Sequence, residues 1–130
     1  MRIFLVEDDP DTRLYFRLYL EELGHSIRSA GSIAEALETM PDEPFDVLIA
    51  DIGLPDGTGW DLLRRMQAAA IPHPGYAVAM SGFGLTADRE RSKAAGYDRH
   101  LVKPFDPDTL EAVLEEAVCN GSAHHRQAPE

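Results

Sequence analysis

Five short apolar runs alternate with five longer segments of helical character along this chain. The apolar runs are largely continuous, which is typical of strands buried on both faces of a sheet. The predicted strands cover residues 3–6, 25–30, 45–50, 76–80 and 97–102. The second of these and the start of the last are more polar than the rest, so they are the weaker strand predictions.

Capping residues and glycines mark the ends of the helical segments between these strands. Asp9 precedes Pro10, which suits the first turn of a helix, and Gly24 suits its end. Ser32 and Glu35 have the spacing of a capping box at the start of a second helix. The predicted helices cover residues 10–23, 33–40, 60–70, 86–95 and 107–118.

Alternation of strands and helices at this spacing implies parallel strands joined by right-handed crossovers. The predicted fold class is therefore α/β: a doubly wound, flavodoxin-like (βα)5 fold with a five-stranded parallel sheet in a three-layer sandwich. At 130 residues, the chain is long enough for one domain with a substantial core. We expect this domain to cover residues 1–119, and the polar, aperiodic residues 120–130 to form a disordered tail.

The composition excludes several function classes. Twelve Lys and Arg against 23 Asp and Glu give a net charge of −11, which argues against direct nucleic acid binding because that requires a basic face. Cys119 is the only cysteine, so no intrachain disulfide can form and a reducing compartment fits. We expect no signal peptide, and no apolar run is long enough to cross a bilayer. We therefore expect a cytoplasmic protein without membrane insertion.

Chemically complementary residues follow four of the predicted strands: Glu7 and Asp8, Asp51, Ser81, and Lys103. A single polar residue after a strand is most often a turn or helix cap. In an open parallel sheet, however, ligands bind outside the carboxyl ends of the strands, so these residues should converge on one rim. Two acids, a lone acid, a hydroxyl and a lysine are the inventory of a site for a divalent cation and a phosphoryl group.

Crowded carboxylates repel one another unless a cation lies between them. Mg²⁺ prefers such oxygen ligands, with Mn²⁺ as a possible substitute, and the carbonyl of Gly53 could add one more. Asp51 could then attack phosphorus and form an aspartyl phosphate. Lys103, the Ser81 hydroxyl and amides near Gly82 would bind the phosphoryl oxygens.

Four motifs of this sequence occur together in one known family. They are Leu5-Val6-Glu7-Asp8-Asp9-Pro10, Asp51-Ile52-Gly53-Leu54-Pro55-Asp56-Gly57-Thr58-Gly59, Ala79-Met80-Ser81-Gly82 and Leu101-Val102-Lys103-Pro104-Phe105. Through them, residues 1–118 resemble the receiver domain of two-component response regulators. The separations of 30 and 52 residues from Asp51 to Ser81 and to Lys103 also match that family.

The resemblance implies a role for each residue of this rim. Asp51 is the implied phosphorylation site, and the implied metal ligands are Glu7, Asp8, Asp51 and the Gly53 carbonyl, while Asp9 caps the following helix. Lys103 is expected to contact the phosphoryl group, and the bond between Lys103 and Pro104 is usually cis in the family.

The resemblance also implies partners. A histidine kinase or phosphotransfer protein would donate the phosphoryl group, and Ser81 would move toward it. The face formed by the fourth helix, last strand and last helix would be the output surface and a possible homodimer contact. Such a domain assists its own phosphorylation and dephosphorylation but is not an enzyme with a separate substrate. The wording of residues 53–57 and 96–103 most resembles receivers of hybrid sensor kinases, so we expect a hybrid-kinase or stand-alone receiver without an output domain.

One position departs from the family pattern. Three residues before the lysine, where the family has an aromatic residue coupled to the hydroxyl, this chain has His100, with Tyr97 nearby. Histidine can rotate and hydrogen-bond, so Ser81 and His100 are the predicted switch pair; the alternative is a partly exposed residue at a strand edge. Gly53 and Phe83 offer no polar side chain to position an attacking water, so we expect Phe83 to shield the phosphoryl group.

Two other classes of protein compete with this interpretation. Phosphatases of the haloacid dehalogenase type also use an aspartyl phosphate, but their nucleophile lies on the first strand and a second aspartate follows two residues later. Here Gly53 occupies that later position, and the acid pair comes first. A pseudo-receiver that only binds partners is the second alternative, because of His100 and because we expect no output domain.

Overall fold

The central sheet consists of five parallel strands, which confirms the predicted fold class. The computed structural model describes residues 1–40, 45–82 and 86–127. The strands are β1 (Arg2–Val6), β2 (Ser26–Ala30), β3 (Val47–Asp51), β6 (Tyr76–Ser81) and β7 (Arg99–Val102). Their order in the sheet is β2-β1-β3-β6-β7, so the chain reverses its direction of travel across the sheet after β2.

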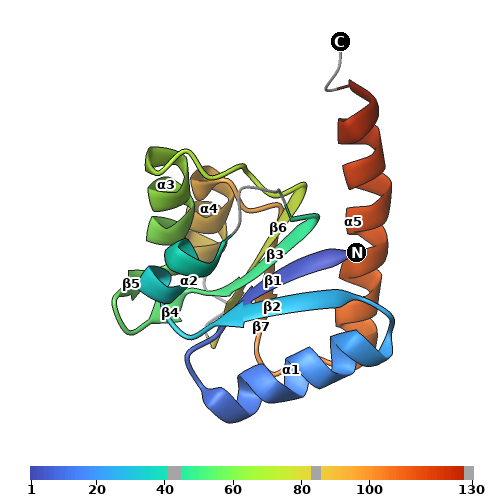
Figure 1. The fold of residues 1–130 in the computed structure, drawn as a ribbon, viewed down its shortest axis with the longest axis horizontal. Coiled ribbons are helices and arrows are strands. Elements are labelled where there is room, and N and C mark those ends of the chain that lie inside the picture. Colours follow the sequence, from blue (N-terminus) through green and yellow to red (C-terminus); the bar gives the residue numbers. More distant parts are fainter. Residues whose placement is uncertain (41–44, 83–85, 128–130) are drawn as a thin grey trace.

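Helices cover both faces of this sheet (Figure 1). They are α1 (Pro10–Glu22), α2 (Ile33–Thr39), α3 (Gly59–Ala68), α4 (Thr86–Ala95) and α5 (Pro107–Gln127). α1 and α5 lie on one face, and α2, α3 and α4 lie on the other. Within the described residues, no helix combines the length and the apolar character needed to span a membrane.

The two faces of the sheet carry separate hydrophobic clusters, and successive residues of β1 alternate between them. Ile3 and Leu5 pack in the cluster that includes Phe16 of α1 and residues of α5, whereas Phe4 and Val6 pack in the cluster of α2 and α3. Because both faces are covered, the inner strands β1, β3 and β6 are apolar at nearly every position. The edge strands β2 and β7 keep exposed polar residues, which explains their weaker apolar pattern.

Local interactions of the loop after β3 were not predicted from the sequence. Two short strands, β4 (Gly53–Leu54) and β5 (Gly57–Thr58), pair in antiparallel fashion within it. Between them, the Asp56 carboxylate accepts hydrogen bonds of 2.9 Å from the amides of both Ile33 and Ala34. Asp56 therefore ties the loop that follows the candidate nucleophile to the start of α2.

Helix capping partly differs from the prediction. Asp9 caps α1 and Ser32 caps α2 as expected, but Glu35 accepts from the Gly31 amide, so only half of the predicted capping box forms. A complete box occurs at α3, where Thr58 and Asp61 satisfy each other's amides. The Thr-x-x-Asp spacing was visible in the sequence, but Thr58 lay two residues before the predicted helix start.

The last helix also extends beyond its predicted end. α5 continues to Gln127 rather than ending at Val118. No proline follows Pro107 until Pro129, and Gly121 makes helix less favourable without excluding it. Disorder of residues 120–130 and the domain boundary at 119 stay predictions.

Substitution of Asp56 by asparagine should reduce stability by about 1 kcal/mol, because it weakens two hydrogen bonds to a charged acceptor. The loss is no larger because Asp56 is exposed. The amides of Ala34 and Ile33 lower the pKa of Asp56. Its stabilising effect is therefore present above the ordinary aspartate pKa of about 3.9 and is lost as the pH falls through the lower folded value. Thermal denaturation should show a difference in Tm between wild type and variant at pH 7 that shrinks below about pH 4.

Glu22→Gln is the matched control, because it removes one exposed carboxylate charge at the end of α1, on the other face of the sheet from α2. Equal loss of Tm in both variants would show that net charge, and not the contact with α2, explains the effect.

Candidate functional site

The predicted residues converge at the carboxyl edge of the sheet. Glu7 follows β1, Asp51 ends β3, Ser81 ends β6 and Lys103 follows β7. β1 and β3 are neighbours at the centre of the sheet, and the helices that follow β1 and β2 pack on opposite faces. The group therefore lies at the topological switch point, where open α/β sheets bind their ligands.

Lys103 joins two of the carboxylates directly. Its Nζ donates a hydrogen bond of 2.6 Å to Oε1 of Glu7 and one of 2.5 Å to Oδ2 of Asp51. Glu7 is 1% exposed and Asp51 is 8% exposed, so water does little to screen their charges. The lysine is their shared counter-charge, and breaking this contact would leave two buried like charges side by side.

One lysine does not fully compensate the negative charge of this cluster. Burial, together with the neighbouring charge of Asp51, raises the pKa of Glu7 to about 7, although the hydrogen bond from Lys103 opposes this shift. Burial lowers the pKa of Lys103, but its hydrogen bonds to Asp51 and Glu7 outweigh that effect and raise it overall. Additional positive charge would therefore favour the ionised form of Glu7.

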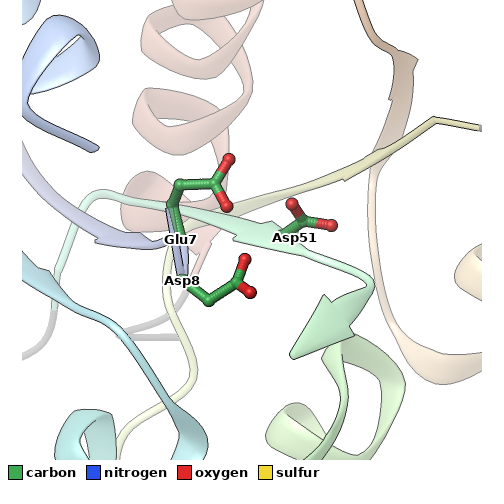
Figure 2. A group of neighbouring side chains, drawn as sticks. All are labelled: Glu7, Asp8 and Asp51. Atoms are coloured by element: carbon green, nitrogen blue, oxygen red, sulfur yellow. The ribbon is translucent and has the colours of Figure 1, made fainter. Parts of the chain in front are cut away.

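Asp8 completes a group of three carboxylates that point toward a common space (Figure 2). Glu7, Asp8 and Asp51 can each place one oxygen within 4.8 Å of the others. These donors fit Mg²⁺, which takes hard oxygen ligands and keeps several waters. The exposed position of Asp8 leaves one side of the group open to solvent.

The chain around Glu7 is held by the start of α1. Nη1 of Arg13 donates a hydrogen bond of 2.8 Å to the Glu7 carbonyl. Asp9 accepts from the Thr12 amide as the helix cap, and its own amide lies 3.4 Å from Oε2 of Glu7. Asp9 is thus engaged with the helix, as predicted, while Asp8 faces the site.

The backbone after Asp51 packs tightly, and the role of Gly59 in this packing was not predicted from the sequence. The Gly53 amide donates to Oδ1 of Asp51 at 3.0 Å, whereas the predicted role of the Gly53 carbonyl as a metal ligand stays a prediction. A Cβ at Gly59 would lie 2.6 Å from the Asp51 carbonyl oxygen. Only glycine allows α3 to begin this close to the candidate nucleophile.

Ser81 lies next to His100 across the edge of the sheet. The Ser81 Oγ and His100 Nε2 are 2.7 Å apart, and His100 is half-buried on the edge strand β7. Tyr97 is engaged elsewhere, because its buried hydroxyl donates to the Gly59 carbonyl at 2.6 Å. The geometry thus pairs Ser81 with His100 and not with Tyr97, while the movement of this pair stays a prediction.

Three further predictions concern this edge of the sheet. Gly82 follows Ser81 and is exposed. Its predicted role, donation of a hydrogen bond from its amide to a phosphoryl oxygen, stays a prediction. The Lys103–Pro104 peptide bond is cis. Phe83, the predicted shield of the phosphoryl group, lies outside the described residues.

Comparison with protein families gives one match over most of the chain. The model of the response regulator receiver domain matches residues 3–115. Among curated proteins, a 14.6 kDa protein of Leptolyngbya boryana is 30% identical over 89% of this chain and 88% of its own length. The virulence sensor protein BvgS of Bordetella pertussis is 33% identical, and the response regulator protein PilR of Pseudomonas aeruginosa is 32% identical.

The chain spans only part of the larger relatives. It covers 11% of BvgS and 28% of PilR, while these matches include 100% and 98% of this chain. Solved structures agree with the family match. A CheY-like receiver domain protein of Methanospirillum hungatei JF-1 is 28% identical with a TM-score of 0.81, over 94% of this chain and 97% of that one. A receiver domain of Methylobacillus flagellatus is 28% identical with a TM-score of 0.76, over 90% of this chain and 98% of that one.

Replacement of Lys103 by methionine should make the protein depend on a cation for full stability. Without a divalent ion, the variant should lose about 2 kcal/mol, less than the ~3–5 kcal/mol of a fully buried pair because Lys103 is partly exposed. Mg²⁺ should then raise the Tm of the variant more than that of the wild type, because the ion takes over the charge that the lysine supplied. Thermal denaturation in EDTA and in Mg²⁺ measures both effects.

The control is Lys93→Met, which removes an exposed lysine of α4 and should behave like the wild type in both buffers. If Mg²⁺ stabilises none of the three proteins, the carboxylate group does not bind this ion.

Proposed function

This chain belongs to the response regulator receiver domain family, and on that premise we propose that Asp51 accepts a phosphoryl group in a two-component phosphorelay. The donor would be the phosphohistidine of a kinase or phosphotransfer protein. One observation supports this most strongly: the Lys103 ammonium lies within hydrogen-bonding distance of Asp51 at the switch point of the sheet, beside a group of carboxylates. The lysine thus lies where the charge of an incoming phosphoryl group would arrive.

The transfer uses side chains that already converge. An oxygen of Asp51 forms the new bond to phosphorus while the P–N bond of phosphohistidine breaks, and the released imidazole keeps the electron pair and takes up a proton. Lys103 turns from the Asp51 carboxylate toward the phosphoryl oxygens, and the Ser81 hydroxyl and the Gly82 amide donate to them. Hydrolysis of the aspartyl phosphate by water returns the domain to its first state.

Mg²⁺, or Mn²⁺ in its place, would be held by Glu7, Asp8 and Asp51 with the Gly53 carbonyl. When bound, the cation offsets the repulsion between these carboxylates and the phosphoryl oxygens. Glu7, whose pKa is raised to about 7 by burial and by Asp51, is the ligand that most needs this charge.

The response to phosphorylation would begin at Ser81 and His100. A phosphoryl group adds about one to two negative charges at the rim, and Ser81 donates to it. Its contact with His100 connects that change to β7, and thereby to the face formed by α4, β7 and α5, which we propose as the output surface. The exposed cations on that face, Arg89, Lys93 and Arg99, suit an acidic partner or a second copy of this acidic chain.

A partner kinase needs a docking surface beside Asp51, and α1 offers one. Leu14, Tyr15 and Leu18 are 53%, 56% and 57% exposed and lie on one side of the helix. α1 begins next to the carboxylate group, and its rise places Leu14 and Leu18 about 6 and 12 Å along the axis from Pro10. Exposed apolar side chains gathered next to a reactive site are typical of protein interfaces. We propose that an apolar surface of the phosphodonor packs here.

The chemistry is tested by incubation with acetyl phosphate and Mg²⁺, followed by intact-mass measurement. The wild type should gain the mass of one phosphoryl group only when Mg²⁺ is present, because Asp51 attacks only when the charge around it is compensated. Asp51→Asn should gain nothing. Absence of any gain in the wild type, with acetyl phosphate and with every kinase of a panel, would leave a domain that binds partners without phosphotransfer.

The docking surface is tested separately with a kinase that phosphorylates the wild type. The double variant Leu14→Ser and Leu18→Ser should accept phosphate from that kinase about ten-fold more slowly, because buried apolar contacts hold most interfaces together. Its reaction with acetyl phosphate should be unchanged. Leu23→Ser, at the opposite end of α1 and 41% exposed, is the matched control. Equal kinase rates in all three proteins would place the docking surface elsewhere.

A further inference from the structure

A continuous chain of hydrogen bonds leads from Ser81 to the helix layer on the far side of α4. The Ser81 Oγ is 2.7 Å from His100 Nε2, and His100 Nδ1 is 2.8 Å from the Ser92 Oγ. The indole Nε1 of Trp60 donates to the same Ser92 Oγ at 2.8 Å. These hydrogen bonds therefore connect the end of β6 with β7 and, through α4, with α3.

Ser92 links the two halves of this series of hydrogen bonds, and its surroundings hold it in place. Its side chain is buried, and its backbone carbonyl accepts a hydrogen bond from the Tyr97 amide at 2.9 Å. A buried hydroxyl requires partners, and here both are side chains from other elements, His100 on β7 and Trp60 on α3. A serine placed only for packing would not need this arrangement.

Trp60 lies at the surface end of the chain. The guanidinium of Arg91 lies 4.3 Å from the centre of its ring, a cation–π contact. Trp60 also lines a cavity of about 760 Å³ between α3 and α4, together with apolar residues that include Leu63, Met66 and Ile71. A change in the hydrogen bond of the indole would therefore alter one wall of this groove.

Donors and acceptors in the chain must be consistent, and phosphorylation restricts them. With a neutral ring, two arrangements exist: Ser81 donates to Nε2 and Nδ1–H donates to Ser92, or Nε2–H donates to Ser81 and Ser92 donates to Nδ1. When the Ser81 hydroxyl donates its hydrogen bond to a phosphoryl oxygen, it can only accept a hydrogen bond from His100. Only the second arrangement is then left. Both arrangements belong to the neutral ring, in which one nitrogen carries a hydrogen and the other accepts.

In that second arrangement every hydrogen bond runs in one direction. The indole donates to Ser92, Ser92 donates to His100, His100 donates to Ser81, and Ser81 donates to the phosphoryl group. Each hydroxyl accepts one hydrogen and donates one, and no proton is gained or lost. Hydrogen bonds aligned in this way polarise and strengthen one another. The Trp60–Ser92 bond should then be stronger than in the unphosphorylated domain.

We propose that Ser92 and Trp60 are positioning residues of the switch, and that the groove between α3 and α4 is a second surface whose shape responds to phosphorylation. Phosphorylation selects the Nε2–H tautomer of His100. Ser92 then donates to Nδ1, and its hydrogen bond from the indole of Trp60 becomes stronger. The inference rests on the proposed function, because it requires a phosphoryl group on Asp51.

The polypeptide contains one tryptophan, so a single indole resonance in a ¹H–¹⁵N spectrum reports on Trp60. Acetyl phosphate and Mg²⁺ should displace this resonance in the wild type, while intact mass measures phosphorylation in the same sample. Long-range ¹H–¹⁵N spectra, with the His100 signals assigned through His100→Phe, should show a protonated Nε2 and a bare Nδ1 after phosphorylation.

Ser92→Ala should still be phosphorylated, but its indole resonance should no longer respond. Ser92→Thr keeps the hydroxyl and should restore the response, which a purely structural role of Ser92 would not explain. His100→Phe keeps a ring and removes both nitrogens, so it should silence the response even if Ser92→Ala does not fold.

The outcomes separate this inference from the proposed function. Full phosphorylation with an unmoved indole in the wild type, or with an equal displacement in Ser92→Ala, overturns the inference alone. Two protonated nitrogens on His100 would also overturn it, since Ser92 would then accept from both neighbours. No gain of mass overturns the proposed function, and this inference with it.

Discussion

One ammonium group between two buried carboxylates is the contact on which the site depends. Lys103 bonds to Glu7 and to Asp51, residues that come from different strands and would otherwise repel. Because the pKa of Glu7 is still raised to about 7 by its burial and by Asp51, the lysine compensates only part of the charge. A further cation beside these carboxylates would therefore be favourable, which is the compensation that the proposed phosphoacceptor needs.

The helices on both sides of the sheet keep this contact in place. β1, β3 and β6 are buried on both faces, so a shift of one residue in their register would move every side chain to the wrong cluster. The register in turn determines which residues end the strands and meet at the rim. Gly59 and Asp56 add local restraint, one by allowing close approach to Asp51 and the other by tying the loop to α2. The Asp51 carboxylate thus sits at the end of a strand that is buried along its whole length.

The polar chain that leaves this rim has a different character from the cluster itself. This chain of hydrogen bonds needs no charged member; it consists of Ser81, His100, Ser92 and Trp60. Phosphorylation would change the direction of its hydrogen bonds and not its charge. A histidine suits this purpose better than a phenolic ring, because its two nitrogens exchange donor and acceptor roles together. The same domain would then present two responsive surfaces, the face of α4, β7 and α5 and the groove beside Trp60.

The sequence by itself determined the order of the elements, the two-sided burial of the strands and the residues at their carboxyl ends. These follow from local apolar runs and from the geometry common to parallel sheets. The sequence alone therefore predicts that Asp51 and Lys103 lie close together. Only the tertiary structure decided the partners of Asp56, Ser92 and Trp60. Their contacts join elements distant in the sequence, and each depends on how helices pack across a few ångströms, which no local pattern of residues records.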